Sequence, residues 1–230
     1  MRWMPLFDRV IVVFAKRPEP GAVKTRMCPP LSPGQAAALY TAMLDDVLAT
    51  TAAAAAAARA ATWLAVHPPD AAGELAKRSP PGFRGVPQRG ADLAERMAGA
   101  VASAAAAGFE RILLRGSDNP ALPGEELVRG LAALDDADLA VGPDRDGGYG
   151  WIALRGPAPG LFDHPMSTAS VLADTLARAA TLGLRARILA ASFDLDTAAD
   201  LAWLSGARAR GETRECPRTL AHLDALGLWP

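Results

Sequence analysis

Four basic residues gather in one short segment near the N-terminus. The stretch at 15–26 reads AKRPEPGAVKTR and places Lys16, Lys24 and Arg26 around Gly21. Ammonium and guanidinium groups neutralise phosphate oxygens, and a glycine lets the backbone approach a ligand closely. The spacing is not that of the G-x-x-x-x-G-K-[ST] loop of ATPases, so that type of mechanism is not supported. The segment predicts a site for the phosphates of a nucleotide, with a solvated basic loop as the alternative.

The apolar run at 111–114 leads into the segment GSDNP at 116–120, which contains an aspartate. A carboxylate at the carboxyl end of a buried strand can hold Mg²⁺ or Mn²⁺ against a diphosphate, because hard cations take oxygen ligands. Asp118 is therefore a candidate metal ligand and catalytic residue. The alternative is a helix cap, a position for which aspartate is well suited, with Pro120 fitting the first helical turn.

A second pair of acidic residues stands in the segment FDLDT at 193–197. On an extended chain, residues i and i+2 share one face, so Asp194 and Asp196 can grip one cation together. Capping is again the alternative, because Asp196 or Thr197 can start the helix that follows.

A glycine-rich segment, GPDRDGGYG, occupies positions 142–150. Asp-Gly is a strong hairpin signal, so a β-turn between two strands is expected here. Beside a binding site, such a turn also lets an acceptor substrate approach the backbone at Gly147, Gly148 and Tyr149. Asp146 is the candidate general base that takes a proton from the acceptor.

The elements that must position these residues follow from the apolar runs. The run RVIVVFA at 9–15 shows no polar alternation, which is typical of a strand buried on both faces of a parallel sheet. Further strands are expected at 62–66, 111–114, 138–141, 151–154 and 187–189, and helices at 34–58, 91–107, 124–135, 167–182 and 197–208. This alternation predicts an α/β fold with a mainly parallel sheet, whose ligands bind beyond the carboxyl ends of the strands.

The whole chain, 1–230, is expected to form a single domain, because no linker divides it. The proline-rich segment at 79–87 is expected to be a surface loop. The residues at 211–230 are expected to form a short C-terminal appendage.

Charge and cysteine content exclude several classes of protein. The 24 Lys and Arg residues and the 25 Asp and Glu residues leave a net charge of −1, so the basic surface that nucleic acid or an anionic membrane requires is not expected. Cys28 and Cys216 are far apart and suggest neither a disulfide framework nor a zinc site. The apolar run at 10–15 is too short for a signal peptide or a membrane span. A cytoplasmic protein is expected.

Five motifs together resemble an uncharacterised GT-A-like family of transferases, often described as glycosyltransferases and similar to 2-phospholactate guanylyltransferase and molybdenum-cofactor guanylyltransferase. The motifs are AKRPEPGAVKTRM at 15–27, QRGADLAERM at 88–97, GSDNP at 116–120, GPDRDGGYGWIAL at 142–154 and FDLDT at 193–197. They span most of the chain. The resemblance implies a three-layer α/β sandwich of the nucleotide-diphospho-sugar transferase (GT-A, Rossmann-like) type.

The resemblance also implies roles for individual residues. Lys16, Lys24 and Arg26 would lie near the phosphates, together with Gly21 and Thr25, while Gln88 and Asp92 would lie near the nucleoside, and Asp118, Asp194 and Asp196 would hold Mg²⁺ or Mn²⁺. The implied partners are a nucleotide or nucleotide-sugar donor and a small-molecule acceptor. Glycosyl transfer, which releases a nucleoside diphosphate, is the first expectation. Nucleotidyl transfer, which releases pyrophosphate, is the alternative, and a non-catalytic nucleotide-binding module comes third. A homodimer is left open.

Overall fold

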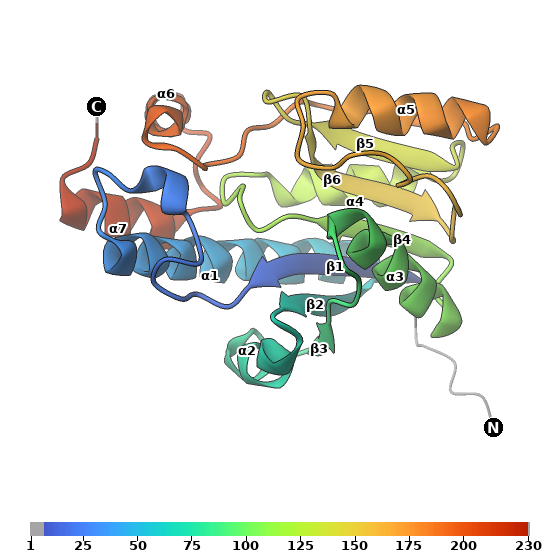
Figure 1. Cartoon of the computed structure of the whole chain (residues 1–230), viewed down its shortest axis with the longest axis horizontal. Helices are drawn as coiled ribbons and strands as arrows, with labels where there is room; N and C mark the ends of the chain where they lie inside the picture. The colour runs from blue at the N-terminus through green and yellow to red at the C-terminus, as the bar shows by residue number, and fades with distance from the viewer. Residues whose placement is uncertain (1–6, 230) are drawn as a thin grey trace.

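The computed structural model describes residues 7–229, and within them seven strands form one sheet in the order β3-β2-β1-β4-β6-β5-β7 (Figure 1). The strands are β1 Arg9–Lys16, β2 Ala61–His67, β3 Phe83–Pro87, β4 Arg111–Arg115, β5 Leu139–Pro143, β6 Tyr149–Arg155 and β7 Ala186–Ile188. All of them run in one direction except β6, which is antiparallel to both of its neighbours. The predicted mainly parallel α/β sheet is confirmed.

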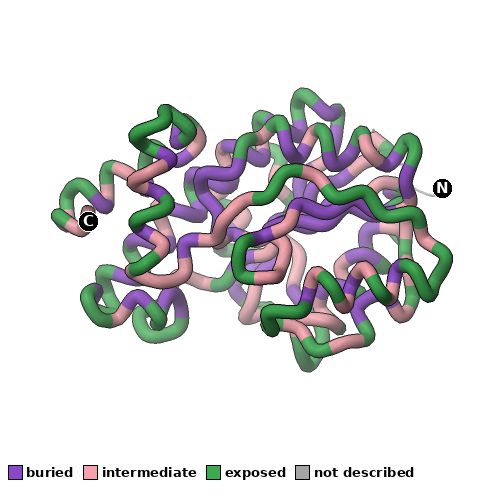
Figure 2. The backbone as a smooth tube through the Cα atoms, turned by 90° about the horizontal axis from the view of Figure 1, so that it is seen from above, coloured by how far each residue is buried: buried purple, intermediate pink, exposed green. Residues whose placement is uncertain are grey.

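Helices cover both faces of this sheet and make a three-layer sandwich (Figures 1 and 2). They are α1 Pro33–Ala58, α2 Ala72–Arg78, α3 Leu93–Ala106, α4 Gly124–Ala133, α5 Val171–Thr181, α6 Leu201–Ala209 and α7 Pro217–Leu226. Helices α3 and α5 pack on one face of the sheet, and α1, α2 and α4 pack on the other. Figure 2 shows the buried strands along the middle, with helices on either side whose outer surfaces are exposed.

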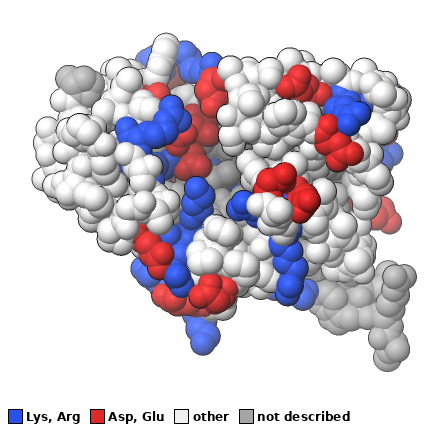
Figure 3. Space-filling model, in the orientation of Figure 1, with Lys and Arg blue, Asp and Glu red and all other residues white. Residues whose placement is uncertain are grey.

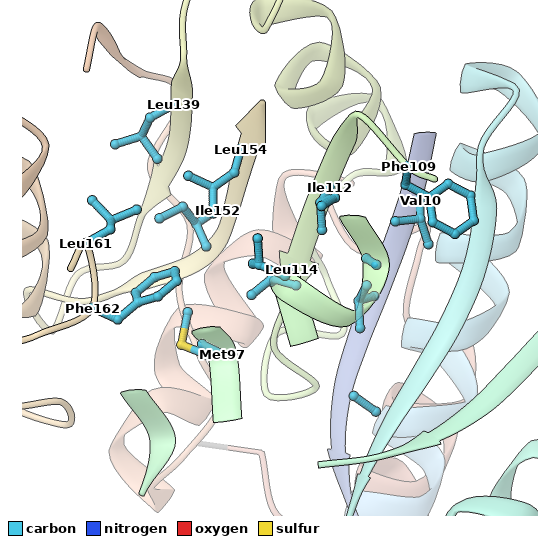
Figure 4. Close-up of a cluster of buried hydrophobic side chains, with 14 of the residues drawn as sticks. Val10, Met97, Phe109, Ile112, Leu114, Leu139, Ile152, Leu154, Leu161 and Phe162 are labelled. Carbon is cyan, nitrogen blue, oxygen red and sulfur yellow. The ribbon is translucent and has the colours of Figure 1, made fainter. Parts of the chain in front are cut away.

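Strand β1 serves both faces of the sheet because side chains alternate along a strand. Val10 and Val12 join the cluster beneath α3 and α5, part of which is drawn in Figure 4, whereas Ile11 and Val13 point toward α1 and its neighbours. All four are completely buried. An apolar run without polar alternation is therefore what a central strand of a three-layer fold requires.

The start of helix α1 is fixed by hydrogen bonds between residues next to it in the sequence. The hydroxyl of Ser32 accepts a hydrogen bond from the backbone N–H of Gln35, and the Gln35 side chain accepts one from the N–H of Ser32. This reciprocal cap, with Pro33 in the first turn, satisfies backbone donors that a helix start leaves free. The helix then carries Tyr40 to the carboxyl edge of the sheet, where its hydroxyl meets the end of β1.

The loops that carry the candidate residues meet at one edge because parallel strands share their carboxyl ends. Strand β6 is antiparallel and therefore starts at this same edge, where Gly150 O accepts a hydrogen bond from Gly116 N. The predicted hairpin is confirmed: β5 and β6 are adjacent antiparallel strands, and Asp144 N donates to Gly148 O across the turn.

The segment at 79–87 is only partly a loop, so the expectation of a surface loop throughout is wrong. Residues Phe83–Pro87 form β3, the edge strand that pairs in parallel with β2. Gly85 lets α2 approach closely, because a Cβ atom there would lie 2.4 Å from the carbonyl oxygen of Ala72. Pro87 stands at the last position of the strand, as an edge strand tolerates.

The segment expected to be an appendage contains α7, which packs against α1. Asp46 of α1 has no exposed surface, and its carboxylate accepts hydrogen bonds from the backbone N–H groups of Arg218 and Thr219, at 3.2 and 2.7 Å, and from the Thr219 hydroxyl, at 2.8 Å. A buried carboxylate thus caps the start of α7, as favoured by the helix dipole. Within residues 7–229, no helix has the length and apolar character needed to cross a membrane.

Candidate active site

A cleft of about 750 Å³ opens at the carboxyl edge of the sheet. Figure 3 shows the molecule hollowed on this side, with basic and acidic side chains gathered around the hollow. Most of the predicted site residues line the cleft: Lys16, Lys24, Thr25, Arg26, Gln88, Asp118, Asp146, Gly148, Tyr149, Asp194 and Asp196. Gly21, Asp92 and Gly147 do not line it. Segments that are far apart in the sequence therefore build one site.

Lys24 lies between two of the predicted metal ligands. Its ammonium group donates to Oδ1 of Asp118 and, at 2.8 Å, to Oδ1 of Asp196. Only 3% of the Lys24 side chain is exposed. Burial alone would lower the pKa of Lys24, but the charges of Asp118 and Asp196 outweigh it and raise the pKa above its ordinary value. Arg26 adds a weaker contact, 3.5 Å from the other oxygen of Asp196. Lys24 is therefore charged and acts as the counter-ion of this pair.

Asp194 stands close to three further carboxylates. Its pKa is raised well above the ordinary value, first by desolvation and then by the charges of Asp118, Asp144 and Asp196. Asp144 is buried, which raises its own pKa, and its Oδ2 atom has no hydrogen-bond partner among the described residues. Sequence reasoning did not single out Asp144. The available signal was its place, directly after β5, which matches that of Asp118 after β4.

The chemistry of this donor set suits Mg²⁺ or Mn²⁺. Carboxylate oxygens are the ligands these ions prefer, and the neighbouring carboxylates that raise the pKa of Asp194 crowd negative charge at a point where a divalent cation would offset it. In the part of the chain that the structure describes, no three acidic, His or Cys side chains are arranged as a metal-ligand group. Metal binding by Asp118, Asp194 and Asp196 stays a prediction.

Gln88 lines the cleft with its hydrogen-bond donors already in use. Its amide nitrogen donates to the carbonyl oxygens of Ala15 and Ala65, at 3.1 and 2.9 Å, where β1 and β2 end. Both N–H groups are thereby used, and the oxygen is the group left for a ligand. Gln88, which follows β3, thus links the end of that strand to β1 and β2 through hydrogen bonds. Its sequence motif does not reveal this structural role.

Asp92 caps α3, with its Oδ1 atom accepting a hydrogen bond from Glu95 N at 2.9 Å. It lines a second cavity of about 460 Å³, between α3 and the residues at 157–164, and not the main cleft. The structure therefore does not bring Asp92 together with the other predicted nucleotide-binding residues. Contact with the nucleoside stays a prediction for this residue.

Arg115 and Tyr40 hold the loop that carries Asp118, and sequence reasoning missed both. The Arg115 guanidinium donates to Asn119 O at 3.0 Å and to the Thr51 hydroxyl of α1 at 3.1 Å. The Tyr40 hydroxyl is hydrogen-bonded to the Ser117 hydroxyl at 2.8 Å. Burial lowers the pKa of Arg115 to about 10. An arginine at the end of a buried apolar strand was a signal that could have been followed.

The glycine-rich turn packs against the start of α5. Leu172 N donates to Gly147 O at 2.9 Å, and a Cβ atom on Gly147 would lie 2.0 Å from the carbonyl oxygen of Ala169. Asp146 accepts a hydrogen bond from Gly148 N at 2.8 Å, which shapes the turn and leaves its carboxylate at the cleft wall. The role of Asp146 as general base is not tested by this geometry and stays a prediction.

Comparisons with known proteins place this architecture in a family. A model of the family described as "Uncharacterized protein conserved in bacteria (DUF2064)" matches residues 50–168, more than half of the chain. Two curated relatives are each named phosphoenolpyruvate guanylyltransferase. The protein of Chloroflexus aggregans is 30% identical over 179 residues, covering 75% of this chain and 86% of the relative. The protein of Sphaerobacter thermophilus is 32% identical over 187 residues, covering 80% of this chain and 86% of the relative.

A solved structure agrees with these matches. The crystal structure of a protein from Desulfovibrio desulfuricans, described as a nucleotide-diphospho-sugar transferase, superposes with a TM-score of 0.84 at 33% identity. The match covers 96% of this chain and 97% of that protein. The expected fold type and the relation to guanylyltransferases are confirmed, and the protein is a transferase. The chain belongs to the family described as DUF2064.

Proposed function

We propose that this protein is a nucleotidyltransferase that transfers a nucleoside monophosphate group from a nucleoside triphosphate to a small anionic acceptor. The observation that carries the proposal is the buried Lys24 ammonium held between Asp118 and Asp196 in a cleft that Lys16 and Arg26 also line. Such a combination of cations and carboxylates suits a metal-bound polyphosphate. The names of the curated relatives favour a guanylyl group.

The proposed reaction breaks one bond at the α-phosphorus. An acceptor oxygen attacks the α-phosphorus, the bond to the bridging oxygen of the β-phosphate breaks, and pyrophosphate leaves. Asp146 takes the proton of the acceptor if its attacking group is a hydroxyl; an ionised acceptor such as a phosphate or carboxylate needs no base. The charges of Lys16, Lys24 and Arg26 stabilise the negative charge that develops on the leaving pyrophosphate.

Mg²⁺ or Mn²⁺, held by Asp118 with Asp194 or Asp196, would supply further charge neutralisation at the phosphates. The acceptor is proposed to lie beside the glycine-rich turn, where Gly148 and Tyr149 line the cleft. The two free thiols and the near-neutral net charge support a cytoplasmic location for this proposed enzyme.

The test is a product assay with purified protein. GTP and phosphoenolpyruvate, the acceptor in the relatives' names, are incubated with Mg²⁺ or Mn²⁺, and pyrophosphate release and the mass of the product are measured. ATP, CTP and UTP test the base, and other small phosphorylated acids test the acceptor. Asp118→Asn is expected to lower kcat by at least about a hundredfold if this carboxylate holds the metal. Asp136→Asn, an exposed aspartate remote from the cleft, is the matched control and should keep full activity.

Glycosyl transfer is the second candidate, supported by the description of the Desulfovibrio protein. The same assay distinguishes it, because a nucleotide sugar would then yield a nucleoside diphosphate in place of pyrophosphate. Release of a nucleoside diphosphate only, with a glycosylated product, would contradict nucleotidyl transfer. No product from either class of donor would contradict both candidates.

A further inference from the structure

Lys24 is set apart from the other cations of the cleft by its surroundings. The chain has three lysines, at positions 16, 24 and 77. Lys24 is almost fully buried and ion-paired to two carboxylates, whereas the Lys16 side chain is exposed and makes no ion pair among residues 7–229. Lys24 also has a left-handed backbone, with φ of 48°, which is uncommon for a residue other than glycine. The fold therefore places this one ammonium group between Asp118 and Asp196.

Lys24 and a divalent cation would compete for the same two carboxylates. Its ammonium uses one oxygen of Asp118 and one of Asp196, the carboxylates predicted to hold a divalent cation. A divalent cation on the same two carboxylates would face the Lys24 charge across a few ångströms, and like charges that close repel one another, the more so because the Lys24 side chain is buried. Lys24 must then have another partner for its charge. The phosphates of a nucleotide in the same cleft offer one.

We propose that Lys24 acts as an exchangeable counter-ion. In the free protein it neutralises Asp118 and Asp196, and when a nucleotide binds it transfers its hydrogen bonds to the phosphates and releases the two carboxylates for a divalent cation. Nucleotide and cation therefore bind cooperatively, each making the site better for the other. This inference rests on the proposed function in one respect, namely that nucleotide phosphates bind in this cleft.

Manganese binding without nucleotide is the first test. Free Mn²⁺ is measured by electron paramagnetic resonance during titration of the wild type, Lys24→Met and Lys16→Met. Lys24→Met is expected to bind Mn²⁺ about tenfold more tightly than the wild type, because no ammonium has to be displaced. Lys16→Met removes the same charge from the same cleft without freeing a carboxylate, so its affinity should stay within about threefold of the wild type.

Added nucleotide completes this test. GTP should tighten Mn²⁺ binding in the wild type more than in Lys24→Met, because part of the coupling is lost with the lysine. Equal Mn²⁺ affinity of Lys24→Met and wild type without nucleotide, in a variant whose circular dichroism shows a native fold, would overturn the proposal. An equal gain in both lysine variants would also overturn it, since a general charge effect would then suffice.

A measurement on the wild type keeps the proposal testable should Lys24→Met not fold. With ¹³Cε-labelled lysine, three NMR signals are expected, which Lys16→Met and Lys77→Met assign. The Lys24 signal should shift when GTP and Mg²⁺ are added together, while that of Lys77, outside the cleft, stays in place. An unchanged Lys24 signal at saturating GTP and Mg²⁺ would contradict the exchange.

The two proposals fail in different ways. If Lys24→Met tightens Mn²⁺ binding but no nucleotidyl product forms with any triphosphate, the proposed function is wrong and the counter-ion role stands. If the product forms and Lys24→Met leaves Mn²⁺ binding unchanged, the counter-ion role alone is wrong.

Discussion

The Tyr40 hydroxyl is hydrogen-bonded to the Ser117 hydroxyl at 2.8 Å and also accepts a hydrogen bond from the backbone N–H of Lys16 at 2.9 Å. Tyr40 belongs to α1, Lys16 ends β1, and Ser117 precedes Asp118 in the loop after β4. One buried phenol therefore joins the segment that carries the cations to the segment that carries the first candidate carboxylate. Burial raises the pKa of Tyr40 to about 12, so the hydroxyl stays protonated across the physiological range.

Tyr40→Phe is expected to lower both stability and turnover. The substitution leaves the Lys16 N–H and the Ser117 hydroxyl without their partner, at a cost of about 1–3 kcal/mol in the free energy of unfolding. The nucleotidyl transfer rate should fall because the two loops lose their common link, and urea unfolding and pyrophosphate release measure these effects. Thr41→Val is the control, because among residues 7–229 the Thr41 hydroxyl donates its hydrogen bond only to Ala37 O of its own helix. A Tyr40→Phe protein with wild-type turnover would contradict the positioning role.

Arg115→Met is expected to show whether Arg115 acts by positioning the loop that carries Asp118 or by contributing to nucleotide binding. The guanidinium spans α1 and the Asp118 loop through Thr51 and Asn119, and its loss leaves buried acceptors unpaired, which costs about 3 kcal/mol. If the loop shifts, kcat should fall while the KM for nucleotide changes little. Arg111→Met alters the other end of the same strand, where Arg111 pairs with the exposed Asp135, and should cost about 1 kcal/mol or less. Equal losses of kcat in both variants would indicate a general effect of stability.

Much of the fold follows from local sequence patterns. The run at 9–15 contains enough β-branched residues without polar alternation to indicate a buried central strand, and β1 is confirmed there. Strand β3 was missed because it is a short edge strand with Gly85 and Pro87, whose pairing with β2 depends on a contact that no local pattern records. The packing of α7 was missed for the same reason, since it depends on Asp46, more than 170 residues earlier in the chain.

The sequence was enough to predict where the candidate site lies, but not which hydrogen bonds and ion pairs form within it. Asp118 and Asp194 follow apolar runs, and the rule that parallel strands share their carboxyl ends brings them to one edge. The place of Lys24 between carboxylates was not predictable, because it requires the side chains of three distant segments to meet. The hydrogen bonds of Gln88 likewise depend on where β1 and β2 end together, a tertiary property that its motif does not encode.

Gly147→Ala is expected to disrupt the glycine-rich turn. The φ of Gly147 is 89°, and a Cβ atom there would lie 2.0 Å from Ala169 O, a contact that forces the turn or the start of α5 to move. Gly156→Ala is the matched control, because Gly156 has a similar φ of 78° but open space around its Cα. Both variants carry the backbone strain of about 1–2 kcal/mol, so the clash should appear as a further loss of about 1–3 kcal/mol in Gly147→Ala alone. Equal unfolding free energies would refute the clash.

Cys216 is expected to make the protein less stable at alkaline pH. Burial, and then the charges of Asp46 and Glu215, raise the pKa of its thiol to about 12, whereas an unfolded cysteine ionises near pH 8.5. Above that value the unfolded chain releases a proton that the native protein keeps, so rising pH favours unfolding. Between pH 8.5 and 10 the loss from this thiol approaches about 1.4 kcal/mol per pH unit.

Urea unfolding of the wild type, Cys216→Ala and Cys28→Ala across this pH range tests the assignment. Cys216→Ala should show a shallower loss of stability with pH than the wild type, although its absolute stability is lower because a buried side chain is shortened. Cys28→Ala is the matched control: it shortens a half-buried cysteine packed against the same apolar cluster but keeps the Cys216 thiol, so the part of the slope that comes from Cys216 should remain. Tyr40 and Tyr149, whose pKa values are also raised, are present in all three proteins. Their contribution to the pH dependence of stability is therefore the same in each and does not affect the comparison. Parallel slopes for the wild type and Cys216→Ala would show that the Cys216 thiol ionises as readily in the native protein as in the unfolded chain.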